Sequence, residues 1–436
     1  MTWKKVKLGD ILKESKIISK NPNPDRRITV RLKVLGVEKR GFENEVEGAT
    51  KQYIRKAGQF IYGKQNFHKG AFGIVPPELD GFESSSDIPA FDVDKSCLPE
   101  FIFYFFKQGS FYLELSKIAS GVATQRINTT QLFELELLLP NIDTQKQLIS
   151  NIQLLEKNGS QISAELSLQL TLVKKLRQQL LQDAVQGKLV EQNKNDEPAS
   201  ELLKKIKAEK EKQTAKKKLK KEKVLPPIKP EEIPFEIPES WVWCRLGEIA
   251  NLVTSGSRDW AKYYSSEGEI FVRMGNLSRD SYSLRMDKIQ YVKPPKNQEG
   301  NRTRLEADDI LISITGEVGN LGLIPKDFGE AYINQHTALV RLNKAIVVKY
   351  ICNLFLSRTL QEQFNAPQRG MKNSFRLTDI DYLLIPLPPL SEQNRIIQKL
   401  DELMQYCNEL EVSIKQSESQ NEKLLQQVLR EALRKD

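Results

Sequence analysis

The chain has 436 residues, of which 39% are hydrophobic, and its formal net charge is +9. This length allows two or three domains with cores of their own. Four scattered cysteines without a Cys-x-x-Cys pair argue against a disulfide scaffold or a zinc cluster, and no apolar run is long enough for a signal peptide or a membrane span, so we expect a cytoplasmic protein without a membrane partner.

Residues 1–142 are predicted to form a first globular unit. Short β-prone runs at 29–37, 60–62 and 72–75 are punctuated by glycine or proline and predict strands. The aromatic segment from Phe101 to Phe106 matches a more clearly helical stretch in the second half of the chain. We therefore expect a buried helix there, although such a run could instead stack on bases.

Residues 143–190 are predicted to form a long coiled-coil helix, because apolar residues recur at intervals of seven in two interleaved series. The two series are Leu148, Leu155, Ile162, Gln169 and Leu176, and Ile152, Gly159, Leu166, Val173 and Leu180.

Residues 191–235 carry most of the net charge. Between Lys204 and Lys223 there are 11 lysines and three glutamates, a surplus of eight, so the rest of the chain is nearly neutral. We expect a helix that begins near Asp196 and Pro198, followed by an extended, proline-rich linker. By its charge, the segment is either a solvated helix with a flexible linker or a strip that contacts phosphates.

The second half of the chain repeats the first. Adding 248 to the helix positions gives a second apolar pattern from Ile396 to Val428, and Trp3 has a counterpart in Trp241. Residues 236–390 are therefore predicted to form a second globular unit, and 391–436 a second coiled-coil helix.

Common catalytic motifs are missing from the sequence. There is no Gly-x-x-x-x-Gly-Lys-Ser/Thr phosphate loop and no Asp/Asn-Pro-Pro-Tyr/Phe tetrapeptide, and the two histidines, His68 and His336, do not correspond in the repeat. The polar, basic loops at 121–128 and 370–376 carry side chains that can donate to phosphates and base edges, although an ordinary surface loop is the alternative. We expect a protein that is not an enzyme.

The chain resembles the specificity subunits of type I restriction-modification systems, and the resemblance extends over nearly its whole length. The segments that carry it are Leu387–Gln393, Leu180–Val190 with Asn195–Leu203, Gln59–Tyr62 with Gly70–Pro76, and Asp308–Ile312 with Gly319. In the first copy, the segment Asn141–Gln145 departs from the proline-rich sequence of the second copy, although Gln145 keeps its place. The resemblance implies an α+β fold in which two mixed α/β target-recognition domains are joined by long antiparallel coiled-coil helices with an internal pseudo-two-fold repeat.

The same resemblance implies a function in DNA recognition. Each globular unit would read one half of a bipartite, asymmetric target in double-stranded DNA, and the helices would act as a ruler and as docking sites for two modification subunits. Restriction and translocase subunits would join them. S-adenosylmethionine, ATP and Mg would serve these partners in adenine-N6 methylation and restriction, while this chain would bind no cofactor. The alternative is a non-catalytic tandem coiled-coil scaffold or adaptor.

The candidate DNA contacts are polar or basic side chains in the loops of both globular units. They are Lys64, Gln65, Asn66, Lys69, Gln125 and Arg126 in the first unit, and Ser257, Arg258, Arg273, Asn276, Lys372 and Asn373 in the second.

Overall fold

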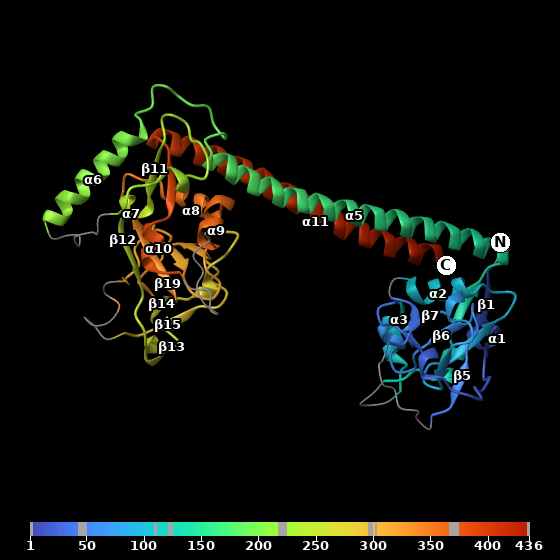
Figure 1. The fold of residues 1–436 in the computed structure, drawn as a ribbon. Coiled ribbons are helices and arrows are strands. Elements are labelled where there is room, and N and C mark those ends of the chain that lie inside the picture. The colour runs from blue at the N-terminus through green and yellow to red at the C-terminus, as the bar shows by residue number, and fades with distance from the viewer. Residues whose placement is uncertain are drawn as a thin grey trace. The chain divides into compact units, whose positions relative to one another are not determined.

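The computed structural model describes residues 3–41, 50–108, 111–120, 125–216, 225–294, 300, 303–365 and 375–433. The chain forms two compact units, unit 1 (Met1–Gln169 with Ser413–Asp436) and unit 2 (Leu170–Val412). Two long helices, α5 (Ile142–Val185) and α11 (Leu390–Leu433), each contribute to both units (Figure 1). Among the described residues, no helix combines the length and the hydropathy that a membrane span requires.

Unit 1 contains a four-stranded sheet and three strand pairs. Its strands are β1 (Lys4–Lys7), β2 (Leu12–Glu14), β3 (Ile28–Val30), β4 (Val37–Lys39), β5 (Gln52–Ile54), β6 (Phe60–Tyr62), β7 (Phe72–Ile74), β8 (Glu83–Ser85), β9 (Ala90–Val93) and β10 (Glu136–Leu139). The sheet has the order β2-β9-β6-β7, and the pairs are β1 with β10, β3 with β4 and β5 with β8. All of these pairings are antiparallel.

The core of unit 1 is aromatic. Its helices are α1 (Leu8–Ile11), α2 (Pro99–Lys107), α3 (Phe111–Glu114) and α4 (Thr129–Phe133), with short 3-10 turns η1 (Pro24–Arg26), η2 (Phe67–Lys69), η3 (Pro77–Leu79) and η5 (Leu115–Lys117). On α2, Phe101 and Phe106 are at most 1% exposed, and the Phe106 ring stacks on that of Phe60 at a centroid distance of 5.7 Å. The prediction of a buried helix is confirmed, and these two rings are not available to stack on bases.

Unit 2 contains two four-stranded sheets and one strand pair. Its strands are β11 (Val242–Arg245), β12 (Ala250–Ser255), β13 (Tyr264–Ser265), β14 (Glu269–Val272), β15 (Gln290–Val292), β16 (Ile310–Ser313), β17 (Leu321–Leu323), β18 (Ala331–Ile333), β19 (Thr337–Leu342) and β20 (Leu384–Leu387). Its remaining helices are α6 (Ala199–Ala215), α7 (Leu246–Ile249), α8 (Val348–Leu356), α9 (Arg358–Asn365) and α10 (Leu377–Asp381), with 3-10 turns η6 (Pro230–Glu232), η7 (Trp260–Tyr263) and η8 (Met274–Asn276).

The internal repeat is visible in the strand order. Unit 2 has the sheet β12-β19-β16-β17 and the pair β11-β20, which match β2-β9-β6-β7 and β1-β10 of unit 1. The helices α7, α8 and α10 follow these strands in the same order as α1, α2 and α4. The sheet β13-β15-β14-β18 has no match in the strand order of unit 1, so the two copies share only part of their strand pairing. The predicted α+β fold with an internal repeat is confirmed.

A buried glutamine fixes the start of each long helix. The Gln145 side chain accepts a hydrogen bond from the Leu98 backbone N (2.8 Å) and donates to the Pro140 carbonyl (2.8 Å). Gln393, 248 positions later, accepts from the Val347 N (3.0 Å) and donates to the Pro388 O (3.0 Å). Both side chains are 0% exposed. Each amide thereby ties its helix to the segment that precedes α2 or α8.

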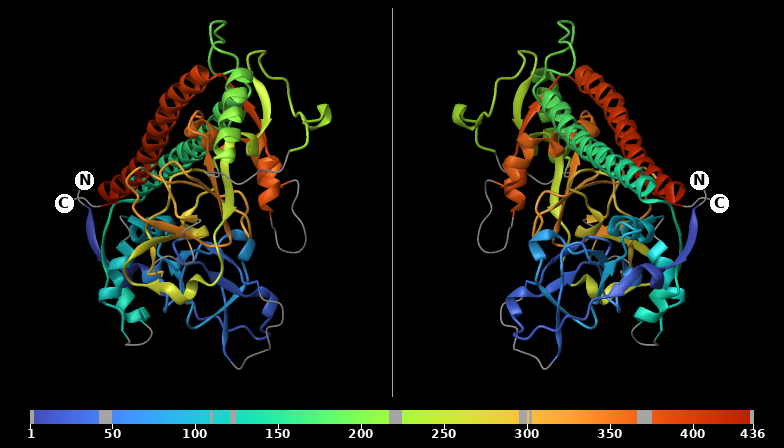
Figure 2. Two further views of the ribbon diagram at one scale, coloured as in Figure 1. Left: turned by 90° about the vertical axis from the view of Figure 1, so that its left-hand side faces the viewer. Right: turned by 90° about the vertical axis from the view of Figure 1, so that its right-hand side faces the viewer.

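The long helices α5 and α11 have 44 residues each and pair in an antiparallel sense (Figure 2). In unit 1 the Asn421 amide donates to the Gly159 carbonyl (2.9 Å). In unit 2 the Arg177 guanidinium donates to a Glu411 carboxylate oxygen (2.9 Å). Partner numbers thus fall along α11 as they rise along α5, which confirms the antiparallel arrangement.

The predicted two-series seam of α5 is only half buried. One series is 2 to 8% exposed at Ile152, Leu166 and Val173. The other series is 39 to 49% exposed at Leu155, Ile162 and Leu176. The coiled-coil pairing with α11 thus buries one series of α5 and leaves the other largely exposed.

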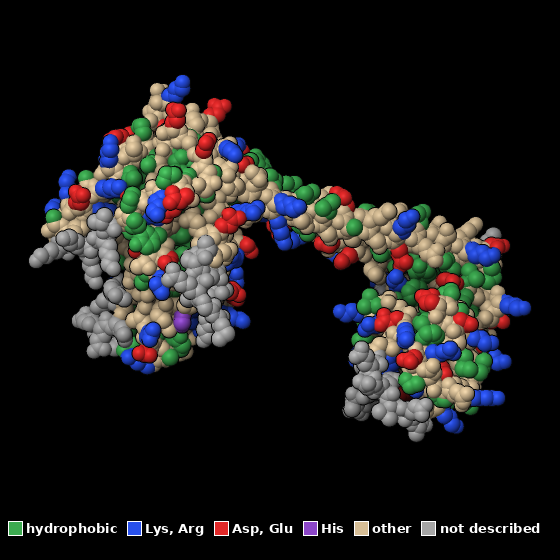
Figure 3. Space-filling model, in the orientation of Figure 1, with side chains coloured by type: hydrophobic (Ala, Val, Ile, Leu, Met, Phe, Trp, Pro, Cys, Tyr) green, Lys and Arg blue, Asp and Glu red, His purple; other side chains and the backbone are tan. Residues whose placement is uncertain are grey.

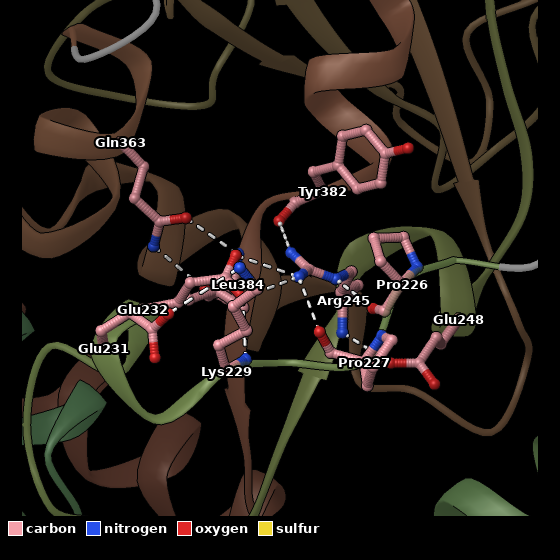
Figure 4. A network of polar contacts seen from close by, with 10 residues as sticks. All are labelled: Pro226, Pro227, Lys229, Glu231, Glu232, Arg245, Glu248, Gln363, Tyr382 and Leu384. Atoms are coloured by element: carbon pink, nitrogen blue, oxygen red, sulfur yellow. Dashed lines mark hydrogen bonds and ion pairs between the residues drawn. The ribbon is translucent and has the colours of Figure 1, made fainter.

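The proline-rich linker is fastened to unit 2 by the Arg245 side chain, which is 5% exposed (Figure 4). Its guanidinium donates to the Pro226 carbonyl (2.9 Å), to both Glu232 carboxylate oxygens (3.0 and 3.1 Å) and to the Tyr382 carbonyl (3.1 Å). A buried guanidinium needs such partners, because an unpaired buried charge is strongly unfavourable. The linker is therefore bound along the surface of unit 2.

The lysine-rich helix α6 packs one face against the rest of unit 2. Leu202 and Ile206 belong to the core of this unit. The Lys210 ammonium, on the same helix, donates to the Gly247 carbonyl of α7 (2.7 Å), and Lys207 pairs with Glu248 (2.7 Å). The described part of this charged segment is thus anchored and partly neutralised, and lysines 217–223 lie outside the described residues.

Candidate nucleic-acid interface

The β6–β7 loop of unit 1 carries four of the predicted contact residues, Lys64, Gln65, Asn66 and Lys69. Its shape comes from the Asn66 carbonyl, which accepts from the Lys69 N (2.9 Å) and the Ala71 N (3.1 Å). Lys64, Gln65 and Asn66 are half-buried, while Lys69 is exposed.

Gln125 and Arg126 lie beside this loop, although they are some 60 residues away in the sequence. The Ile127 N donates to the Lys64 carbonyl (2.9 Å), which fixes the two segments together. Both predicted side chains are exposed, and Arg126 pairs loosely with Asp87 at 3.6 Å. An exposed pair of this kind contributes little to stability, so the guanidinium can exchange partners readily. The six predicted residues of unit 1 therefore form one polar surface.

A segment that sequence reasoning missed joins the same surface. In the turn between β3 and β4, the Lys33 N donates to the Lys69 carbonyl (2.8 Å) and the Val34 N donates to the Gly70 carbonyl (2.9 Å). The Lys33 side chain is exposed beside Lys69. The dipeptide Lys33-Val34 has none of the residues that usually mark tight turns, so no local signal pointed to it.

In unit 2, Ser257 and Arg258 lie between β12 and η7. The Ser257 hydroxyl accepts from the Trp260 indole N (3.1 Å), and Ser257 forms a bridge with Asn334. Ser257 is half-buried and Arg258 is exposed. These contacts fix the backbone at Ser257, and the neighbouring Arg258 side chain is exposed to solvent.

Asn276 is placed differently from the expectation. It is 5% exposed, and its amide accepts from the Arg273 N (2.9 Å) and donates to the Arg285 carbonyl (2.8 Å). Its hydrogen-bonding groups are used within the loop, so Asn276 positions this loop, while Arg273 remains half-buried. The last two predicted residues, Lys372 and Asn373, lie outside the described residues.

The candidate interface of unit 2 also contains a polar group that sequence reasoning did not find. Thr315 follows β16, and its hydroxyl lies 2.7 Å from the His336 Nδ1, while the Gln335 amide lies 2.9 Å from Nε2. The Ile314 N donates to the His336 carbonyl (3.0 Å), and the Phe375 N donates to the Ile314 carbonyl (2.9 Å). This polar group is held by the segment that follows β16, by the segment between β18 and β19, and by the backbone of Phe375.

The two candidate interfaces share backbone contacts and differ in side chains. In unit 1 the Lys64 N donates to the Asp87 carbonyl (2.9 Å), as the Ile314 N does to that of His336 in unit 2. Asp87 and His336 differ by 249 positions, close to the offset of the repeat, so this correspondence was available from the sequence. The backbone frame is shared, and each unit places its own donors and acceptors on it.

Among the described residues, no group of three or more histidines, cysteines, aspartates or glutamates is arranged to hold a metal ion. The four cysteines are buried thiols, and burial raises the pKa of Cys97 to about 12. Such a thiol is not a nucleophile at neutral pH. The chemistry that this arrangement offers is hydrogen bonding and charge contact with a polar partner.

The comparisons with known proteins agree on one family. The family model described as "Type I restriction modification DNA specificity domain" matches residues 1–172 and 238–417. The EcoAI type I restriction enzyme specificity subunit of Escherichia coli is 35% identical over 299 residues, which cover 64% of this chain and 50% of that protein. The EcoEI specificity subunit of the same species is 29% identical over 257 residues, covering 54% of this chain and 41% of the relative. The chain thus spans about half the length of these relatives.

Solved structures share the fold. The HsdS subunit from Thermoanaerobacter tengcongensis matches 100% of this chain with 97% of its own length, at a TM-score of 0.59 and 17% identity. A chain from a structural study of complex assembly and conformational transition in a type I R-M system matches with a TM-score of 0.62 and 18% identity, covering 100% of this chain and 98% of that one.

Proposed function

Because this chain belongs to the type I restriction-modification DNA specificity domain family, we propose that it is a specificity subunit that reads a bipartite, asymmetric target in double-stranded DNA. The observation that carries the proposal is the pair of equivalent interfaces. Both rest on the same backbone frame, but Lys64, Asp87 and Arg126 in unit 1 are replaced by a different set, including Thr315 and His336, in unit 2. Because the two units place different hydrogen-bond donors and acceptors on the same backbone frame, they recognise different bases, and the two half-sites differ.

The partners are two modification subunits, together with restriction and translocase subunits. Each long helix exposes part of one apolar series, as at Leu155 and Ile162 on α5 and at Leu424 on α11, and Figure 3 shows hydrophobic side chains at the surface of the helices. An open apolar row on a coiled coil fits a further helix from a partner. The repeated helices offer similar rows to two copies of the same modification subunit.

Catalysis in this proposal belongs to the partners and takes place in the cytoplasm. Modification subunits carry S-adenosylmethionine and transfer its methyl group to adenine N6, which requires extrusion of the base from the helix. ATP and Mg serve the restriction and translocase subunits. The role of this chain is to hold its partners at a defined sequence without binding a cofactor itself.

The test is a base-by-base methylation map of genomic DNA from cells that express this chain with the modification subunit encoded beside it. We expect an asymmetric two-part motif with N6-methyladenine in both halves, and no such motif in cells without this chain. Methylation that is the same with and without the chain, or absent despite a folded, partner-bound complex, would contradict the proposal and favour a coiled-coil scaffold.

Single residues of the interface are tested on the mapped target. Arg126→Ala should lower affinity by about 1 to 3 kcal/mol and relax specificity at one position of the half-site if the guanidinium reads a base, or weaken binding to all sequences alike if it contacts a phosphate. Arg26→Ala, an exposed cation on η1, is the matched control. Unchanged affinity and preference in both Arg126→Ala and Arg258→Ala would remove these residues from the interface.

A further inference from the structure

The tip of the β3–β4 hairpin presents an apolar side chain to solvent. Leu35 is 75% exposed, the highest value for a large hydrophobic side chain among the described residues. Exposed leucines scattered on a surface are ordinary, but this one sits at the end of a two-stranded ribbon that reaches the candidate interface of unit 1. The backbone that carries it is also held by hydrogen bonds to the neighbouring loop.

The turn that carries Leu35 is strained and anchored. Lys33 and Val34 have φ angles of +57° and +58°, a region that side chains with a branched Cβ rarely enter. The Leu35 N donates to the Leu32 carbonyl (3.3 Å), so these two residues are the centre of a tight turn of the kind usually formed by Asn-Gly. The hydrogen bonds from Lys33 N and Val34 N to the β6–β7 loop hold this conformation. Strain that surrounding structure maintains is typical of functional sites.

Two glycines allow the ribbon to lie against the β6–β7 hairpin. A Cβ on Gly70 would lie 2.9 Å from the Val34 backbone N, and a Cβ on Gly73 would lie 2.6 Å from the Val37 Cγ2. Both the turn at Val34 and the strand β4 at Val37 are therefore packed against the β6–β7 hairpin, and the Leu35 side chain projects from this anchored turn. The backbone that carries Leu35 is therefore fixed.

The charge of the ribbon indicates which kind of partner it binds. Residues 31–41 contain four cations and one carboxylate, Glu38, and Glu38 is already paired with Arg31 at 2.6 Å. The exposed Lys33 stands next to Leu35 and beside Lys69. A basic two-stranded ribbon has the dimensions that the major groove of DNA admits, and a leucine at its tip complements the methyl group of thymine.

We propose that the β3–β4 ribbon enters the major groove of the half-site read by unit 1, where Leu35 contacts a thymine methyl group and Lys33 contacts a neighbouring phosphate. The inference rests on the proposed function and deepens it, because it assigns a specificity-determining residue to an element that has no counterpart in the shared sheet order of the two units. It also predicts that the half-site contains a thymine whose methyl group matters.

The experiment uses the complete complex with its modification subunits and a short duplex that carries the mapped target. Leu35→Ala should weaken binding about five- to tenfold without changing the dependence of affinity on salt, because no phosphate contact is lost. Lys33→Ala should instead reduce the slope of log affinity against log salt by about 1. Ile18→Ala, a 55% exposed apolar residue of the same unit that bridges to Tyr53 of β5, is the matched control and should bind as the unchanged protein does.

Replacing each thymine of the half-site by deoxyuridine removes one methyl group at a time. At one position this replacement should weaken binding by the unchanged complex and have no further effect on Leu35→Ala. Affinity that is unaltered in Leu35→Ala, a loss that couples to no thymine, or a loss of complex formation with the modification subunits in the absence of DNA would each overturn the assignment. If the unchanged complex prefers no sequence at all, the proposed function itself fails.

Discussion

At the scale of single residues, the repeated part of the molecule depends on polar side chains in the interior. Gln145 and Gln393 are completely buried, yet each amide is bonded on both its oxygen and its nitrogen. A buried polar group is stabilising only in this fully bonded state, because removal of one partner leaves the others unsatisfied. Glutamine at this point is therefore a structural requirement of the helix start.

We predict that Gln145→Ala lowers the free energy of unfolding of the chain by about 2 to 4 kcal/mol. The substitution leaves the Leu98 N and the Ser96 and Pro140 carbonyls without their partner. Urea denaturation measures the change, and Gln147→Ala, an exposed glutamine on the same helix, should alter stability by less than about 0.5 kcal/mol. Equal effects of the two substitutions would contradict this role.

Glu392 gives a prediction for pH. Its side chain is 0% exposed and accepts from the Gln192 amide (2.5 Å), and burial raises the pKa of its carboxyl above the ordinary value. Between the ordinary pKa of the unfolded chain and the raised pKa of the folded chain, the folded state binds more protons. The free energy of unfolding that this carboxyl contributes therefore increases as the pH falls through the raised pKa. Glu392→Gln should be more stable than the unchanged protein at pH 7, and the difference should shrink as the pH is lowered through the raised pKa. Unfolding measured over a pH series checks this, and a difference that grows on acidification would reverse the assignment.

At the scale of elements, the same helix pattern serves two purposes. The series that includes Ile152 and Leu166 is buried, and the series that includes Leu155 and Ile162 is exposed. Gly159 interrupts the buried series at the point where the Asn421 amide donates to its carbonyl. A polar residue in a seam sets the register of the helices at some loss of stability.

Gly159→Ala should raise the free energy of unfolding by about 0.5 to 1 kcal/mol. The added Cβ would meet only the Asn421 amide, at 3.7 and 4.0 Å, and alanine has less backbone freedom to lose than glycine. Gly9→Ala in α1 is the control of opposite sign, since its Cβ would lie 2.9 Å from the Phe133 Cβ. Thermal unfolding of both variants measures the effects, and a destabilised Gly159→Ala would mean that the seam has no room there.

At the scale of the whole molecule, the chain is a pseudo-dimer made by repetition. Leu429 and Leu433 of α11 belong to the core of unit 1, which also contains Ile149 and Ile152 of α5. Unit 1 thus needs the end of the second long helix to complete its core. Since the two helices share a register at an offset of 248, the first helix of another copy can supply an equivalent surface.

A shortened chain of residues 1–190 should therefore form a dimer and read a palindrome made of two copies of the first half-site. Sedimentation at micromolar concentration tests the dimer, and methylation mapping with the modification subunit tests the palindrome. The full chain, which completes both cores by itself, is the control for self-association. A folded but monomeric shortened chain would show that the helices are not interchangeable.

The sequence by itself determined the repeat, the two long helices and the buried aromatic helix, because heptad spacing and apolar runs are local properties that hold in any context. It also placed Lys64 and Arg126 in candidate loops. It could not show that these loops contact each other, that the Asn276 side chain is hydrogen-bonded within its own loop, or that one apolar series of α5 remains exposed. Nor could it reveal the Lys33-Val34 turn, whose backbone angles are maintained by hydrogen bonds that it donates to a loop more than 30 residues away. Those features depend on contacts between distant segments, so only the tertiary structure decided them.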